Sequence, residues 1–264
     1  MTMTETARRD EKPTPDAMTL SQHLGELRRR LVVCVVAFVA ASLVAVFAYE
    51  PILHFLVKPL CTVDATRGHI TKAGPLFGSD GSCNLFVTSP LDGLSLRTKI
   101  AVFGGLVMSS PVILFQVWRF VTPGLQAREK KYVVPFVSAA FVLFLLGAAT
   151  AYTTLPHALG FLKSVGGPNL QQIYDPIPYL GLIILMMGLF GLTFQFPVVL
   201  VSLELARVVT PAKLLHSWRW AVIIIVVVSA VATPSSDPFS MLALALPLVF
   251  FYFVSIGIGK LFGR

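Results

Sequence analysis

The chain has 264 residues, of which 55% are hydrophobic and 13% are charged. A soluble domain carries roughly 25% charged residues, so the composition excludes an ordinary soluble protein and indicates an all-α integral membrane protein. The net charge of +8 alone would suit a nucleic-acid partner. However, the cations are grouped as in a membrane protein, so we expect no nucleic-acid binding.

The chain begins with a polar segment, residues 1–18, which we expect to be a disordered cytoplasmic tail before a membrane domain at 19–262. Thr19-Leu20-Ser21-Gln22 is typical of a helix N-terminus, because a capping box satisfies the free backbone donors there. Leucines recur at helical spacing from Leu20 to Leu31 and predict a short amphipathic helix at the inner surface that continues into the first span.

Six apolar runs predict six transmembrane helices. They are Leu31–Tyr49, Ile100–Val121, Val133–Leu155, Tyr179–Leu205, Trp220–Thr233 and Met241–Leu261. Pro111, Pro197 and Pro247 lie inside the second, fourth and sixth runs, where the missing backbone donor bends a helix. We therefore expect a concave bundle with short fifth and sixth spans.

The fifth run is about 21 Å long at 1.5 Å per residue, whereas the hydrocarbon core is about 30 Å thick. Thr233-Pro234-Ser235-Ser236-Asp237-Pro238 then turns the chain straight back. Two explanations fit equally well: the hairpin thins the bilayer locally, or neighbouring helices shield a short helix.

The positions of lysine and arginine predict the orientation in the membrane. Fifteen of the 21 cations lie in the N-terminal segment, the 119–132 and 206–219 loops and the C-terminus. That side is therefore expected to be cytoplasmic, with both termini inside. Its positive charge would also attract anionic lipids.

The outer loop, residues 50–99, contains Cys61 and Cys83 in a polar stretch. Because the exterior is oxidising, we expect a disulfide between them, which could contribute about 3 kcal/mol on the entropic model. The alternative is two free thiols. The spacing does not suit a metal site, because no paired Cys or His accompanies them.

The sequence offers little support for catalysis, since no hydrolase, zinc or nucleotide-binding motif occurs, and we expect neither an enzyme nor a cofactor. Gln195 is the polar residue that stands out at mid-membrane. Its amide is expected to form a helix–helix hydrogen bond or to satisfy the backbone group freed by Pro197. Glu204, near the inner end of the same span, could pair with Arg207.

Two acids occur singly inside basic clusters on the predicted cytoplasmic side. Glu26 precedes Arg28-Arg29-Arg30, and Glu129 precedes Lys130-Lys131. Their spacing favours local salt bridges, such as Glu26 to Arg30 at i,i+4, which contribute roughly 0–1 kcal/mol. Because such pairs are weak, the same acids could instead receive a cationic peptide, and an arginine would bind a carboxylate better than a lysine.

Several segments resemble the TatC family, the multispanning receptors of the twin-arginine protein translocase. The matching blocks are 23–31, 110–120, Pro123-Gly124-Leu125, Glu129-Lys130-Lys131, 194–198 and 233–238, and together they cover about 19–255. The resemblance implies a receptor in the cytoplasmic membrane of a prokaryote. Such a protein binds Arg-Arg signal peptides of folded cargo and assembles with single-span TatA/TatB-like subunits, as part of an oligomeric complex that uses the proton gradient.

The resemblance also implies roles for individual residues. Glu26 and Glu129 would recognise the arginine pair, and Leu24, Arg28, Phe120 and Lys131 would shape the binding patch. Gln195, Pro197 and Asp237 would contact a partner helix, and Pro59 in the outer loop matches a further position of interest.

Two positions depart from the family pattern. The family often has Glu where this chain has Gln195, and Lys131 stands where an arginine would allow bidentate contact. A secondary transporter or a structural membrane scaffold remain as alternative functions. Unchanged peptide binding after loss of both acids would favour the scaffold.

Overall fold

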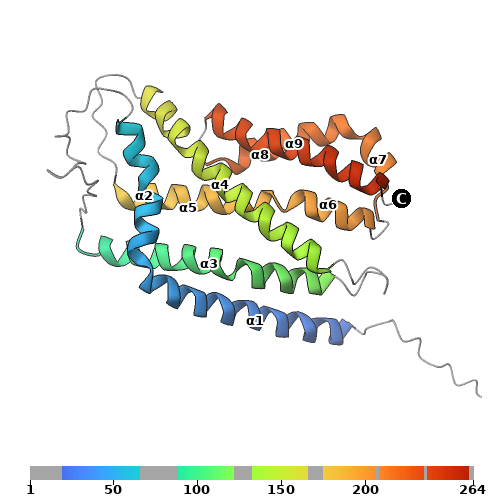
Figure 1. Cartoon of the computed structure of the whole chain (residues 1–264), viewed down its shortest axis with the longest axis horizontal. Helices are drawn as coiled ribbons and strands as arrows, with labels where there is room; N and C mark the ends of the chain where they lie inside the picture. The colour runs from blue at the N-terminus through green and yellow to red at the C-terminus, as the bar shows by residue number, and fades with distance from the viewer. Residues whose placement is uncertain are drawn as a thin grey trace, which may run out of the picture.

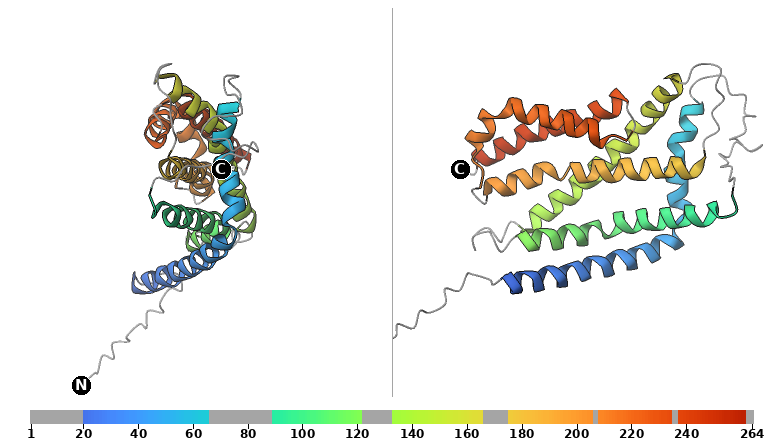
Figure 2. Two further views of the ribbon diagram at one scale, coloured as in Figure 1. Left: turned by 90° about the vertical axis from the view of Figure 1, so that its left-hand side faces the viewer. Right: turned by 180° about the vertical axis from the view of Figure 1, so that it is seen from behind.

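The structure is a computed structural model that describes residues 20–65, 89–121, 133–165, 175–205, 208–234 and 237–261. Those residues form the helices α1 (Leu20–Phe47), α2 (Tyr49–Ala65), α3 (Asp92–Val121), α4 (Val133–Val165), α5 (Pro176–Thr193), α6 (Phe196–Leu205), α7 (Pro211–His216), α8 (Trp218–Ala232) and α9 (Pro238–Leu261). In Figure 1, α1, α3 and the α5–α6 pair lie side by side, and α4 runs obliquely across the α5–α6 pair towards the end of α3. The start of α1 and the end of α9 lie at the same end of the bundle (Figure 2).

Five stretches are long and apolar enough to cross a membrane, and they correspond to the first four predicted spans and the sixth. They are Leu24–Phe47, Asp92–Arg119, Val134–Leu162, Pro176–Leu205 and Pro238–Leu261. The predicted fifth span corresponds to α8, which is apolar and has only 15 residues. The expected short sixth span is wrong. Because α9 begins at Pro238, directly after the turn, it reaches 24 residues, or about 36 Å.

Helix α8 packs against α9 and leaves most of its surface open. Ile225 and Ser229 are its buried residues, whereas Trp220 and Val231 are 71% and 81% exposed. The described neighbours therefore do not enclose α8, which argues against a short helix shielded by the rest of the chain.

Helix α1 is continuous from Leu20 to Phe47, as the merging of the amphipathic segment and the first span predicted. It packs along α3 through small side chains. A β-carbon added to Gly105 would lie 2.8 Å from the Cα of Ser42, and one added to Gly104 would lie 2.8 Å from the Cβ of Ala45. We call these four residues the α1–α3 seam. Because lipid competes equally for apolar surface, close approach of small residues is what holds such helices together.

The crossing of α4 and α5 uses glycine from both helices. A β-carbon on Gly147 would lie 2.6 Å from the carbonyl oxygen of Phe190, and one on Gly191 would lie 2.8 Å from the ring of Phe144. The two backbones can therefore approach closely only because both positions lack a side chain. Phe190 itself is fully buried at this crossing.

Helix α2 occupies part of the segment that the sequence analysis treated only as an outer loop. Pro59 lies inside it, so the backbone carbonyl of Phe55, four residues earlier, loses its usual helical donor. The hydroxyl of Tyr152 in α4 donates to this carbonyl at 2.8 Å, and Tyr179 in α5 donates to the carbonyl of Leu56 at 2.8 Å. Two neutral hydrogen bonds thus fasten α2 across α4 and α5, which positions the end of α1 that precedes it.

Candidate functional site

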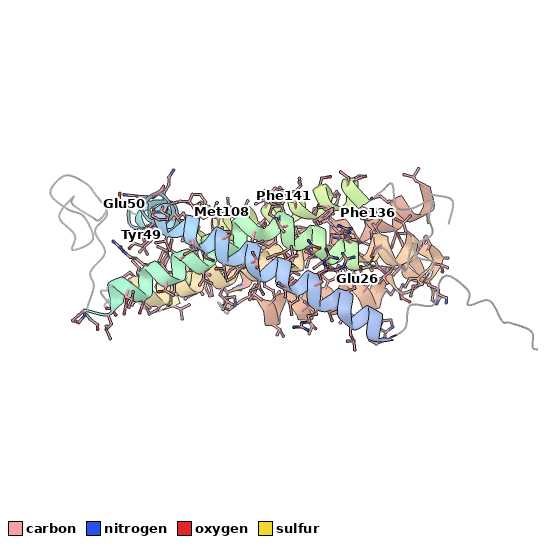
Figure 3. All side chains as sticks on the ribbon, turned by 90° about the horizontal axis from the view of Figure 1, so that it is seen from below. Glu26, Tyr49, Glu50, Met108, Phe136 and Phe141 are labelled. Carbon is pink, nitrogen blue, oxygen red and sulfur yellow. The ribbon has the colours of Figure 1, made fainter. Side chains whose placement is uncertain are left out.

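A polar pocket of about 220 Å³ opens where α1 begins and α3 ends. We call it the rim pocket. It is lined by Glu26, Arg29, Arg30, Val33, Gln116 and Arg119. Its charged groups comprise three guanidiniums and one carboxylate, so the pocket is positive overall and Glu26 is the acid among its lining residues. In Figure 3, Glu26 lies towards one end of the molecule and Glu50 towards the other.

Glu26 forms an ion pair with Arg30, one helical turn later. Arg30 donates to Oε1 of Glu26 from Nε at 3.2 Å and also from Nη2. The i,i+4 salt bridge that the spacing favoured is therefore confirmed. The side chain of Glu26 is 28% exposed, whereas that of Arg30 is only 13% exposed. The carboxylate consequently remains reachable from solvent, while its arginine partner lies deeper.

Arg30 also connects the two helices of the rim pocket. Its Nη1 donates to the backbone carbonyl of Gln116 in α3 at 3.4 Å. Because α3 ends five residues later, at Val121, its negative helix end lies nearby and favours a cation there. This contact spans 86 positions in the sequence, so local spacing could not predict it.

The other residues of the expected peptide-binding patch fall into two groups. Leu24 and Arg28 lie on α1 and are exposed, but neither lines the rim pocket. Phe120 belongs to the last turn of α3, and its side chain is not among those described. Glu129 and Lys131 lie outside the described residues, so their placement stays a prediction.

Gln195 lies at a break between α5 and α6 and not within a continuous fourth span. Pro197, the second residue of α6, lacks the backbone donor that a continuous helix would need. The amide nitrogen of Gln195 donates to the carbonyl of Ala140 in α4 at 2.9 Å. The helix–helix hydrogen bond is therefore the role that the structure gives this side chain.

An apolar groove of about 340 Å³ lies beside this break. It is lined by residues of α4, α6 and α9, among them Phe136, Pro197 and Phe251. Gln195 is not part of the lining. A second and larger apolar groove, of about 660 Å³, runs among α2, α3 and α4, with Met108 among its lining residues. Figure 3 labels one lining residue of each groove, Phe136 and Met108, which lie at different positions along the length of the molecule.

Asp237 caps the first turn of α9. Its Oδ1 accepts a hydrogen bond from the backbone N–H of Ser240 at 2.7 Å, and the residue is only 2% exposed. An aspartate in this position satisfies one of the free donors of the first turn and favours the positive helix end. Its buried position makes it a structural cap of the turn after α8, while direct contact with a partner helix stays a prediction.

Pro59 lies in α2, where it frees the carbonyl that Tyr152 captures. Pro59 was predicted from the sequence to be of interest, whereas Tyr152 and Tyr179 were missed. The available signal for Tyr152 was the freed carbonyl of Phe55, yet the donor comes from a distant helix. Tyr179 donates to the Leu56 carbonyl, which the proline does not free. Cys61 lies in the last turns of α2, its side chain is not described, and Cys83 lies outside the described residues, so the disulfide is untested.

Glu204 is a buried acid that the sequence analysis assigned to a local pair with Arg207. Arg207 lies outside the described residues. Glu204 is 2% exposed, and neither carboxylate oxygen has a hydrogen-bond partner within the described part of the chain. It packs on α9, where a β-carbon on Gly259 would lie 2.7 Å from its carboxyl carbon. The absence of a side chain at Gly259 makes room for this carboxyl group.

Comparison with known families gives a match over most of the chain. Residues 22–247 match the family of the Sec-independent protein translocase protein TatC. A relative from Frankia casuarinae, described as a Sec-independent protein translocase protein TatC, is 40% identical over 240 residues. That alignment covers 89% of this chain and 63% of the relative, so the chain spans less than two thirds of the relative's length.

Two further matches agree with this one. The Escherichia coli K12 protein of the same description is 30% identical, with 75% of this chain and 72% of that protein covered. A crystal structure of the twin-arginine translocase receptor TatC in DDM superimposes with a TM-score of 0.70 at 31% identity. It covers 90% of this chain and 99% of the solved one. The helix arrangement is therefore that of a multi-pass membrane protein with solved relatives.

Proposed function

The chain belongs to the TatC family of Sec-independent protein translocase proteins, and we propose that it is the receptor and core component of a twin-arginine translocase. In this role it binds Arg-Arg signal peptides of folded proteins, and export is driven by the proton gradient. The proposal rests on the rim pocket, in which the family-matched Glu26 is partly exposed to solvent. Translocation of proteins, and not catalysis, is the activity that the family name describes.

The signal peptide docks its arginine pair on Glu26 and Glu129. A guanidinium offers parallel N–H groups that match a carboxylate, and each charged hydrogen bond supplies roughly 1.5–3 kcal/mol. Leu24 and Arg28 are exposed on the same helix as Glu26, which supports their role in shaping the patch. Phe120 and Lys131 complete the patch in this proposal.

Single-span TatA/TatB-like subunits bind near the α5–α6 break, and copies of the chain associate within the complex. The apolar groove that includes Pro197 supports this proposal, because an apolar helix fits a groove of that kind. Gln195 helps to shape this surface from within, through its bond to Ala140. Asp237 orders the start of α9 through its bond to Ser240 and contacts a partner helix there in this proposal.

The protein lies in the plasma membrane of a prokaryote with both termini in the cytoplasm. The distribution of charge supports this orientation. Arg28, Arg29, Arg30, Arg119, Lys213, Arg219 and Lys260 belong to elements at the end of the bundle where α1 begins and α9 ends, whereas Lys58, Arg97 and Lys99 lie at the other. The larger basic group is also the surface that meets anionic lipids.

The test is the double variant Glu26→Gln with Glu129→Gln in the full-length protein. Photo-crosslinking to a twin-arginine signal peptide in membrane vesicles should fall at least tenfold, because two charged hydrogen-bond sites are lost. Glu50→Gln is the matched control, since Glu50 is an exposed acid at the opposite end of the molecule. It should leave crosslinking unchanged. If the double variant crosslinks like the unchanged protein, these acids are not the receptor site.

A further inference from the structure

Arg30 occupies the carboxylate that the proposed receptor function requires. Two of its nitrogens donate to Oε1 of Glu26, and the third donates to the Gln116 carbonyl. A guanidinium bound to Glu26 within this chain is chemically the same group that a twin-arginine peptide would bring. We propose that Arg30 is an internal competitor, which holds Glu26 in the absence of cargo and sets the affinity for the signal peptide. This inference rests on the proposed function.

The geometry allows a peptide arginine to replace Arg30 at Glu26 from the solvent side. Glu26 is more than twice as exposed as Arg30, at 28% against 13%, so a peptide can reach the carboxylate before Arg30 leaves. When the peptide arginine takes over Oε1, Arg30 keeps its second partner, the Gln116 carbonyl near the negative end of α3. The displaced cation is therefore not left buried without a partner, which would be strongly unfavourable.

The remaining charges of the rim pocket reinforce the competition. Arg29 and Arg119 line the same pocket and have the same sign as the incoming peptide. A single weakly bound cation therefore gains little by entering. An arginine pair that also contacts the second acid of the proposed function, Glu129, gains a higher effective concentration at Glu26 and so competes better with Arg30.

Competition makes a quantitative prediction that a direct contact does not. A group that blocks the site lowers the apparent affinity of every ligand by the same factor, because each ligand must displace it at the same cost in free energy. Removing Arg30 should therefore strengthen binding of an Arg-Arg peptide and of its Lys-Lys counterpart equally. If Arg30 instead touched the bound peptide, the ratio of the two affinities would change.

The experiment measures the Kd of fluorescently labelled Arg-Arg and Lys-Lys signal peptides for the full-length protein in detergent. Arg30→Gln should tighten both by roughly three- to fivefold, because release of a partly exposed ion pair is worth up to about 1 kcal/mol. Arg29→Gln is the matched control: it removes the same charge from the same pocket. Because it lacks the competitor's bonds, its effect should be under about twofold.

Arg30→Lys keeps the charge but replaces the planar fork of the guanidinium with a compact ammonium group, which cannot bind the carboxylate bidentately, so it should give an intermediate gain. This variant keeps the test informative if Arg30→Gln loosens the α1–α3 contact, and a thermal melt of each variant reports such loosening. Weaker binding in both Arg30 variants, or a gain no larger than that of Arg29→Gln, would overturn the inference. Glu26→Gln separates this inference from the proposed function. If Glu26→Gln loses peptide binding while the Arg30 variants fail the test, the proposed receptor function stands and only the competition by Arg30 is rejected. If Glu26→Gln binds the peptide unchanged, both the receptor function and the competition are rejected.

Discussion

Helices α1 and α2 follow one another with Ala48 alone between them, yet they are held in place by different chemistry. α2 carries Leu56 and Leu60 in the core, and neutral tyrosine hydroxyls fix its backbone. α1 lies along α3 through the small-residue seam, and its rim end is held by a charge pair that solvent can reach. The difference shows where exchange is possible, because an incoming cation can replace Arg30 at a partly exposed carboxylate but has no charged group to replace at a neutral hydroxyl–carbonyl bond.

The largest effect is expected where the α1–α3 seam is filled. Gly105→Ala places a β-carbon 2.8 Å from the Cα of Ser42, so the backbones must separate. We expect a loss of about 2–3 kcal/mol in unfolding free energy, as for other overpacked contacts. Gly257→Ala is the control, because open space surrounds that position. A thermal melt in detergent that ranks both variants equally would contradict the close approach of α1 and α3.

The next largest effect on stability is expected from the tyrosine hydrogen bonds that hold the backbone of α2. Tyr179→Phe removes a buried hydroxyl that donates to the Leu56 carbonyl, which should destabilise the protein by about 1–2 kcal/mol. Tyr152→Phe should lower the stability less, by about 0.5–1 kcal/mol, because its bond is exposed and the stacking on Phe55 persists. Chemical or thermal unfolding measures both. The reverse order would mean that burial does not govern these bonds.

A smaller effect tests whether the hydroxyl of Tyr152 compensates for the backbone donor that Pro59 removes. Pro59→Ala restores a backbone N–H that can satisfy the Phe55 carbonyl within α2. In the Pro59→Ala variant, Tyr152→Phe should change the unfolding free energy by less than about 0.3 kcal/mol. In the unchanged protein the same substitution should change it by up to about 1 kcal/mol. A double-mutant cycle gives the coupling. Additive effects would show that the tyrosine hydroxyl does not compensate for the proline.

Among the single substitutions, a small effect on stability is also expected at the rim pocket. Glu26→Gln should change the unfolding free energy by no more than about 1 kcal/mol, since partly exposed pairs contribute little. The same variant should nevertheless lower the affinity for the signal peptide. Measuring melting and peptide binding on one preparation separates the two properties. A large loss of stability would place Glu26 among the structural residues, with Tyr179.

Features that depend on local spacing could be predicted from the sequence. The Glu26–Arg30 pair follows from a separation of four residues on a helix. The apolar runs located the five long spans and α8, although some ends differ by seven or eight residues, as at the start of the second span, Asp92 and not Ile100. The break at Gln195 was anticipated through Pro197 as a bend, although two separate helices result.

Features that depend on distant partners could not be predicted. The bond from Arg30 to Gln116 joins two helices far apart in sequence, and the tyrosines that hold α2 come from α4 and α5. α2 itself was missed because prolines and a polar ending interrupt its apolar pattern, while its stability comes from tertiary contacts. The length of α9 was underestimated because the cap at Asp237 lets the helix begin at once after the turn.

The unbroken course of α1 has a mechanical consequence. The helix has 28 residues, or about 42 Å, and its tight contact with α3 at Ser42 and Ala45 lies close to its far end. Glu26 is 16 residues, or roughly 24 Å, from that fulcrum. A tilt of about 5° there would swing the carboxylate by about 2 Å. Because a helix is stiff along its length, a small tilt about the α1–α3 seam would be converted into a larger displacement of the Glu26 carboxylate at the opposite end of α1.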